Sequence, residues 1–73
     1  MLEGFTVKEL RLFSGAGAGL EIDGSAYTAD ELRTIAMVEP AAKCPLIIHN
    51  SASKTPDELR LIAKAGKGRV IFT

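Results

Sequence analysis

The sequence has little of what metal chemistry, disulfide bonding or membrane insertion requires. Its 73 residues include one cysteine, one histidine and no tryptophan. The lone Cys44 excludes an internal disulfide framework, and one Cys with one His cannot form a zinc site within a single chain. The longest apolar runs are a few residues long, which excludes a membrane span, and the N-terminus lacks the basic start and apolar stretch of a signal peptide. We therefore expect a cytoplasmic protein with no membrane partner, no metal and no other cofactor.

The chain also has no net charge, because nine basic residues balance nine acidic ones. Nucleic-acid binders gain affinity mainly by neutralising phosphates, so this balance argues against a nucleic-acid partner. It also removes one barrier to self-association. The length and an apolar fraction of 47% predict a single globular domain over residues 1–73. A domain this small buries only about 60% of its unfolded surface, so its stability alone is marginal.

What the chain does have is an internal repeat. Three stretches read Thr-x-x-Glu-Leu-Arg and begin at Thr6, Thr28 and Thr55. Thr followed three residues later by Glu is the capping box, in which each side chain bonds the other residue's backbone N–H at the start of a helix. Apolar residues at helical spacing follow each box, so the repeat predicts three helices. The units cover about residues 6–23, 28–49 and 55–73.

A short apolar segment follows each predicted helix and reads as a strand. The strands are predicted over Leu20–Asp23, Leu46–His49 and 69–72. The helices are predicted to end at Gly15, Gly17 and Gly19, at Pro40 near Glu39, and at Gly66 and Gly68. Strands joined through helices run parallel, so the chain predicts an α/β fold with a three-stranded parallel sheet and its helices on one face. Equivalent strand residues are 26 apart (Ile22 to Ile48) and then 24 apart (Ile48 to Phe72).

Repeats of one strand and one helix resemble leucine-rich repeats of the ribonuclease-inhibitor type. The stretch that carries the resemblance is Leu46-Ile-Ile48-His-Asn50 followed by Leu59-x-x-Ile62-Ala63. The first unit departs from that pattern, because Gly24 stands where the Asn would be. The resemblance implies a short α/β solenoid. The repeated segments also look like the tails of small bacterial proteins of unknown function, and that likeness implies no activity.

Alternation along the strands divides their side chains between two faces. The residues predicted to face the helices are Leu20, Ile22, Leu46, Ile48, Val70 and Phe72; those predicted to face away are Glu21, Asp23, Ile47, His49, Ile71 and Thr73. Parallel sheets are normally covered on both faces, and residues 1–5 are too few to form a second layer. We also expect both sheet edges to be open. Either a partner covers Ile47 and Ile71, or the chain belongs to a longer array.

Polar residues gather where the predicted strands end and the loops enter the helices. They are Asp23, Ser25, His49, Asn50, Ser51, Ser53 and Thr73. Open parallel sheets bind ligands at this edge, so the group is a candidate ligand site. The same residue types are ordinary in turns and helix caps, and turn chemistry is the preferred interpretation.

Other patterns have simpler explanations. The glycine run from Gly15 to Gly19 follows a helix, whereas phosphate-binding loops precede one, so we interpret it as a helix stop and turn. Five strand residues span roughly 16 Å, which excludes a Cys44–His49 dyad. Cys44 is then a partly buried small hydrophobe.

Charged residues also repeat. Arg11, Arg33 and Arg60 are predicted to form a row beside Glu9, Glu31 and Glu58. Such a row could recognise an acidic partner, but a solvated ladder of Glu–Arg pairs is preferred because the two signs balance. The basic cluster of Lys64, Lys67 and Arg69 is attributed to the preference of cations for helix C-termini.

Two functional classes remain open. The first is a non-catalytic module that self-associates or binds a protein through its uncovered sheet. The second is a small ligand-binding or enzymatic domain, with His49 as general base and Asp23 orienting it. The sequence contains no complete catalytic constellation, which counts against the second.

Overall fold

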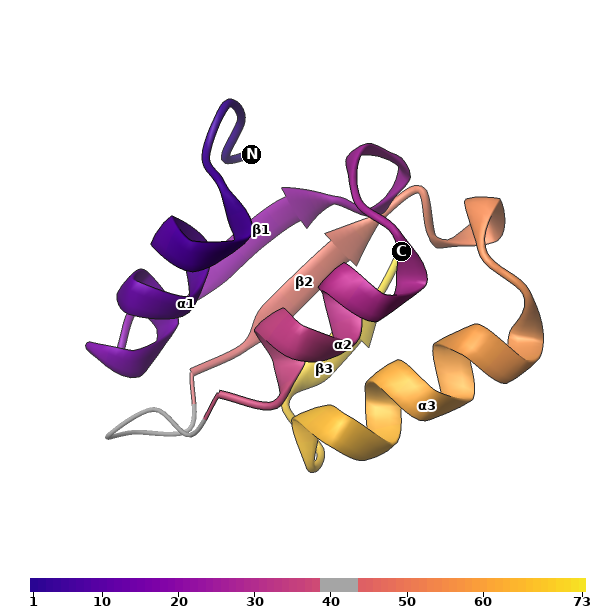
Figure 1. Ribbon diagram of the computed structural model, residues 1–73. Helices are drawn as coiled ribbons and strands as arrows, with labels where there is room; N and C mark the ends of the chain where they lie inside the picture. Colours follow the sequence, from indigo (N-terminus) through magenta and orange to yellow (C-terminus); the bar gives the residue numbers. More distant parts are fainter. Residues whose placement is uncertain (39–43) are drawn as a thin grey trace.

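The computed structural model describes residues 1–38 and 44–73. In these two ranges α-helices alternate with β-strands (Figure 1). The elements are α1 (Val7–Gly15), β1 (Leu20–Asp23), α2 (Ala29–Ala36), β2 (Leu46–His49), α3 (Pro56–Gly66) and β3 (Val70–Phe72). Two short 3₁₀ turns that we did not predict, η1 (Gly24–Ala26) and η2 (Ser51–Ser53), follow β1 and β2.

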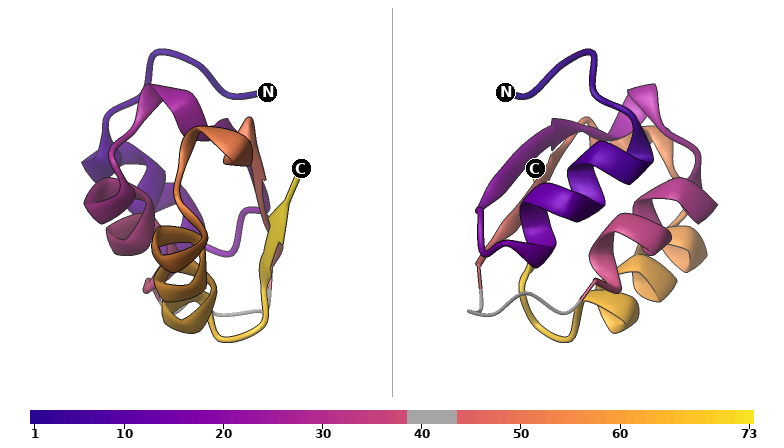
Figure 2. Two further views of the ribbon diagram at one scale, coloured as in Figure 1. Left: turned by 90° about the vertical axis from the view of Figure 1, so that its right-hand side faces the viewer. Right: turned by 60° about the vertical axis from the view of Figure 1, so that its left-hand side comes forward.

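The strands form one parallel sheet in the order β1-β2-β3. Ile22 pairs with Ile48, and Ile48 pairs with Phe72, which confirms the register implied by the repeat spacing. The helices lie together on one face of this sheet, as Figure 2 shows from two sides. The predicted α/β fold class is therefore confirmed.

The capping box starts each of these helices. In all three the threonine side chain accepts from the backbone N–H of the glutamate, and the glutamate side chain bonds the N-cap backbone N–H. The glutamate Oε1 lies 2.9, 2.8 and 2.8 Å from the backbone nitrogens of Thr6, Thr28 and Thr55. Pro56 occupies the first turn of α3, where a missing N–H costs nothing.

The helix ends agree with the prediction at two of three places. The first helix ends at Gly15 in a turn where Gly17 has a φ of 97°, so the glycine run is a helix stop. The third ends at Gly66 with Lys67 in the left-handed region. The predicted end of the second helix near Glu39 is wrong, because α2 ends at Ala36. Pro40 and Glu39 lie outside the described residues.

Arg69 stabilises the early end of α2. Its guanidinium donates to the carbonyl oxygens of Ile35 and Ala36 at 3.3 and 3.1 Å, and to Cys44 O at 3.2 Å. Partial burial lowers the pKa of Arg69. The sequence pattern attributes this cation to a basic cluster at the C-terminus of the preceding helix. Arg69 instead bonds to the C-terminal end of α2, although α3 is the helix that directly precedes Arg69 in the chain.

The core lies between the sheet and the helices. Its buried members are Leu10, Leu20, Ile22, Leu32, Ile35, Ala36, Leu46, Ile48 and Ile62. The burial patterns of β1 and β2 alternate as predicted. Val70 and Phe72 also pack against the core, but they are only partly buried because β3 is the last strand of the sheet.

The N-terminal segment corrects the prediction that both sheet edges are open. Leu2 forms a parallel bridge with Ile22, and its N–H donates to Glu21 O at 2.7 Å. The Tyr27 hydroxyl donates to Phe5 O at 2.9 Å and holds the segment in place. The outer edge of β1 is thus partly paired. No segment of the described ranges pairs with the outer edge of β3.

Candidate functional site

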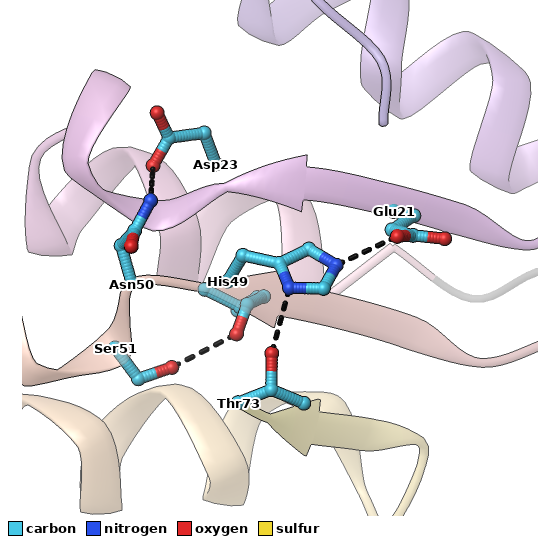
Figure 3. A network of polar contacts seen from close by, with 7 residues as sticks. Glu21, Asp23, His49, Asn50, Ser51 and Thr73 are labelled. Carbon is cyan, nitrogen blue, oxygen red and sulfur yellow. Dashed lines mark hydrogen bonds and ion pairs between the residues drawn. The ribbon is translucent and has the colours of Figure 1, made fainter.

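The predicted ligand group lies at one end of the sheet, but its members bond to one another. Asp23 Oδ1 accepts from the Ser25 N–H at 2.9 Å, from the Ser25 hydroxyl at 2.7 Å and from Asn50 Nδ2 at 2.8 Å. The hydrogen bonds from Asn50 and Ser25 lower the pKa of Asp23. The contact between Asp23 and Asn50 joins the first strand-end loop to the second (Figure 3).

The second loop is also held by its own side chains. Asn50 adopts a left-handed conformation with a φ of 56°, which favours Asn or Gly. The buried Ser51 hydroxyl donates to Ile48 O at 2.9 Å. Lys54 Nζ donates to Gly24 O at 3.0 Å and to Ser53 Oγ at 3.2 Å. Turn chemistry therefore accounts for Asp23, Ser25, Asn50, Ser51 and Ser53 without a ligand.

His49 has different partners from those we expected. Its Nε2 lies 2.7 Å from Glu21 Oε1, and its Nδ1 lies 2.7 Å from Thr73 Oγ1 (Figure 3). The proposed role of Asp23 in orienting His49 is wrong, because the Asp23 carboxylate is turned to Ser25 and Asn50. A carboxylate can only accept, so Nε2 is the donor to Glu21, and Nδ1 shares the second hydrogen bond with the Thr73 hydroxyl. Glu21 could have been identified from the sequence as a partner of His49, because strand alternation places both residues on the same face.

Carboxylate, imidazole and hydroxyl follow one another in the order of a hydrolytic triad, but the surroundings do not complete one. The Thr73 backbone N–H donates to Ile48 O, and the Ser51 N–H donates to Thr73 O, so neither is available to an oxyanion. Two hollows among the described residues lie elsewhere, one around Val7 and one around Pro45. The chain of contacts instead ties all three strands together across the uncovered face of the sheet.

That uncovered face has an apolar centre. Glu21, Ile47 and Ile71 lie side by side across the three strands. Ile47 is half-buried, and Ile71 keeps 48% of its surface exposed. We call the surface formed by Glu21, Ile47, His49, Ile71 and Thr73 the open face.

Cys44 lies apart from His49 and has its own partner. Its Sγ donates to Gly17 O at 2.6 Å and the residue is partly buried, as predicted. Among the described residues there is no group of three or more His, Cys, Asp or Glu side chains that could hold a metal ion.

The predicted ladder of Glu–Arg pairs is wrong. The glutamates bond to their own capping threonines. Arg33 and Arg60 instead lie 3.9 Å from Asp30 and Asp57, three residues earlier on the same helices. Arg11 has no such partner because Lys8 stands at that position. A comparison of the three repeat stretches position by position could have found this.

Comparisons with family models, with curated proteins and with solved structures found no match. The resemblance to leucine-rich repeats therefore stays a prediction. Over residues 1–38 and 44–73, no helix is both long enough and apolar enough to cross a bilayer.

Proposed function

We propose that this protein is a non-catalytic interaction module that self-associates through its open face. One observation carries the proposal: the helices cover a single face of a parallel sheet, and Ile71 is 48% exposed on the other face. Parallel sheets are otherwise found with both faces covered.

The apolar centre supplies a modest driving force. Complete burial of an isoleucine side chain contributes roughly 1.5–3 kcal/mol, and Ile47 is already half-buried within its own chain. Association costs several kcal/mol in lost translational and rotational freedom. We therefore expect weak, reversible dimers rather than a permanent assembly.

Charge favours a second copy as the partner. The only carboxylate of the open face, Glu21, is 2.7 Å from His49 of the same chain. The Glu21 carboxylate of each copy therefore already has a hydrogen-bond partner in its own chain when two copies meet face to face. The zero net charge of the chain acts in the same direction at longer range.

The open edge of β3 offers a second way in which two copies can associate. Successive residues of a strand direct their backbone N–H and C=O groups to opposite sides. The backbone groups of Val70 and Phe72 therefore point away from β2. They can pair with the same strand of another copy. Edge pairing would extend the sheet, whereas packing of the open faces would cover Ile71.

Sedimentation equilibrium over a wide concentration range tests the proposal. The wild-type protein should show a concentration-dependent dimer, and Ile71→Lys should be monomeric with an unchanged circular dichroism spectrum. Ile47→Lys should weaken the dimer as well. Leu61→Lys is the matched control, because Leu61 is 42% exposed but lies on α3 in the helical layer. A wild-type protein that stays monomeric at the highest concentration, or a control variant that weakens the dimer equally, would contradict the proposal.

A further inference from the structure

One position breaks the repeat in a chemically specific way. The second residue of α2 is Asp30 and that of α3 is Asp57, but the second residue of α1 is Lys8. The aspartates each lie 3.9 Å from an arginine of the same helix. In α1 the equivalent arginine, Arg11, has no acidic partner within the part of the chain that the structure describes. Lys8 adds a second positive charge beside it.

No other group of α1 or α2 neutralises these two cations. Glu9 and Glu31 are held in their capping boxes, and Asp30 is the carboxylate that pairs with Arg33. Among the described residues neither Lys8 nor Arg11 forms a hydrogen bond or an ion pair. A cation in the first turn also opposes the helix dipole, so Lys8 does not serve the stability of its own helix.

The two cations line a groove between α1 and α2, which lie side by side in Figures 1 and 2. Its volume is about 510 Å³, and its lining residues are Val7, Lys8, Arg11, Leu12, Thr34 and Val38. Val7 and Val38 are partly buried, whereas Leu12, which also lines the groove, is 63% exposed. The groove thus combines an apolar floor with two positive charges that have no ion-pair partner in residues 1–38 and 44–73. Its volume lies in the range of ordinary binding pockets, about 300–1,000 Å³.

We propose that this groove binds an acidic segment of another protein, with an apolar side chain in the groove and carboxylates on Lys8 and Arg11. The surface is in the helical layer, on the opposite side of the sheet from the open face, so this proposal does not rest on self-association. Unpaired like charges make two copies of the groove repel each other, which excludes a second groove as the occupant. A concave site between two helices fits a peptide side chain better than it fits the plane of an anionic membrane.

The test uses a fluorescein-labelled amphipathic peptide of about a dozen residues, built from Glu and Leu, with fluorescence anisotropy as the readout. A peptide of the same pattern with Lys in place of Glu is the charge control. Wild-type protein should bind the Glu peptide, with affinity that falls as salt rises, and should not bind the Lys peptide. Lys8→Asp and Leu12→Ser should each weaken binding about tenfold or more.

The variants also separate binding from folding. Lys8→Asp restores the residue of the other two units, so its denaturant midpoint should equal or exceed that of the wild type while its binding is lost. Arg60→Ala and Leu61→Ser change the equivalent exposed positions of α3 and should leave binding intact. Failure of the wild type to bind the Glu peptide, equal binding of both peptides, or equal loss in the α3 variants would overturn the proposal. Binding to phosphatidylserine vesicles in place of the peptide would also overturn it.

Discussion

The first and third units of this chain begin alike and end differently. Thr6 and Thr55 both start their helices with a complete capping box. Beyond the box, Arg60 lies near Asp57, whereas Lys8 stands at the matching position before Arg11. The difference shows that a short repeated motif specifies how a helix starts, while the residues between the motif's fixed positions decide what the helix surface can bind.

The two helix ends differ in the same way. A Cβ atom added at Gly15, the last residue of α1, would lie 3.6 Å from Val38 Cγ1, which is ordinary contact. A Cβ atom added at Gly66, the last residue of α3, would overlap Val70 Cγ2. Neither glycine has a positive φ. The third unit therefore uses glycine for close packing onto β3, whereas the first unit does not need it.

The largest expected effect follows from that contrast. Gly66→Ala should destabilise the protein by about 1–3 kcal/mol, because Val70 must move out of a packed position. Gly15→Ala should be neutral or stabilising by up to about 1 kcal/mol, since Ala loses less backbone entropy on folding. Chemical denaturation of both variants measures the difference. Equal destabilisation by the two alanines would remove the distinction between the units.

The caps provide a finer comparison. Thr55→Ala and Thr28→Ala should each cost about 0.5–2 kcal/mol through loss of an N-cap. Thr6→Ala should cost less, although α1, with nine residues, is no shorter than α2, with eight. The reason is that α2 packs more extensively on α3 than on α1, so the helix that Thr6 caps contributes less of the packing between helices. Denaturant midpoints rank the three variants, and a largest cost at Thr6 would show that the first unit carries more of the stability than its packing indicates.

The smallest effect concerns pH. Backbone and side-chain hydrogen bonds with Thr55 lower the pKa of Glu58 from its ordinary value of 4.5. The folded state therefore binds the Glu58 proton less tightly than the unfolded state does. The stability from this group is fully present above the ordinary value and is lost as pH falls through the lower folded value. Glu58→Gln should flatten the unfolding free energy over that acidic window, measured by denaturation at several pH values. An unchanged slope would assign the acid sensitivity to other carboxylates, such as Asp23.

The candidate sites show where reasoning from the sequence stops. Alternation placed Glu21, His49 and Thr73 on one face. It could not show that His49 reaches to Glu21 at 2.7 Å while Asp23 turns back to Ser25 and Asn50. Side-chain direction at a strand end depends on the competing partners that the neighbouring loop presents, and those partners come from a different unit.

Local rules were enough for the helix starts, the strands and the parallel register, because capping boxes, apolar spacing and the repeat length act over a few residues or over one unit. Only the tertiary structure decided the contacts between units. The end of α2 depends on Arg69, which is more than thirty residues away in the chain. The edge of β1 is paired by Leu2, and the groove exists because α1 and α2 meet above the sheet. These features depend on which groups come together after folding, and their hydrogen bonds and charges have no counterpart in the local pattern.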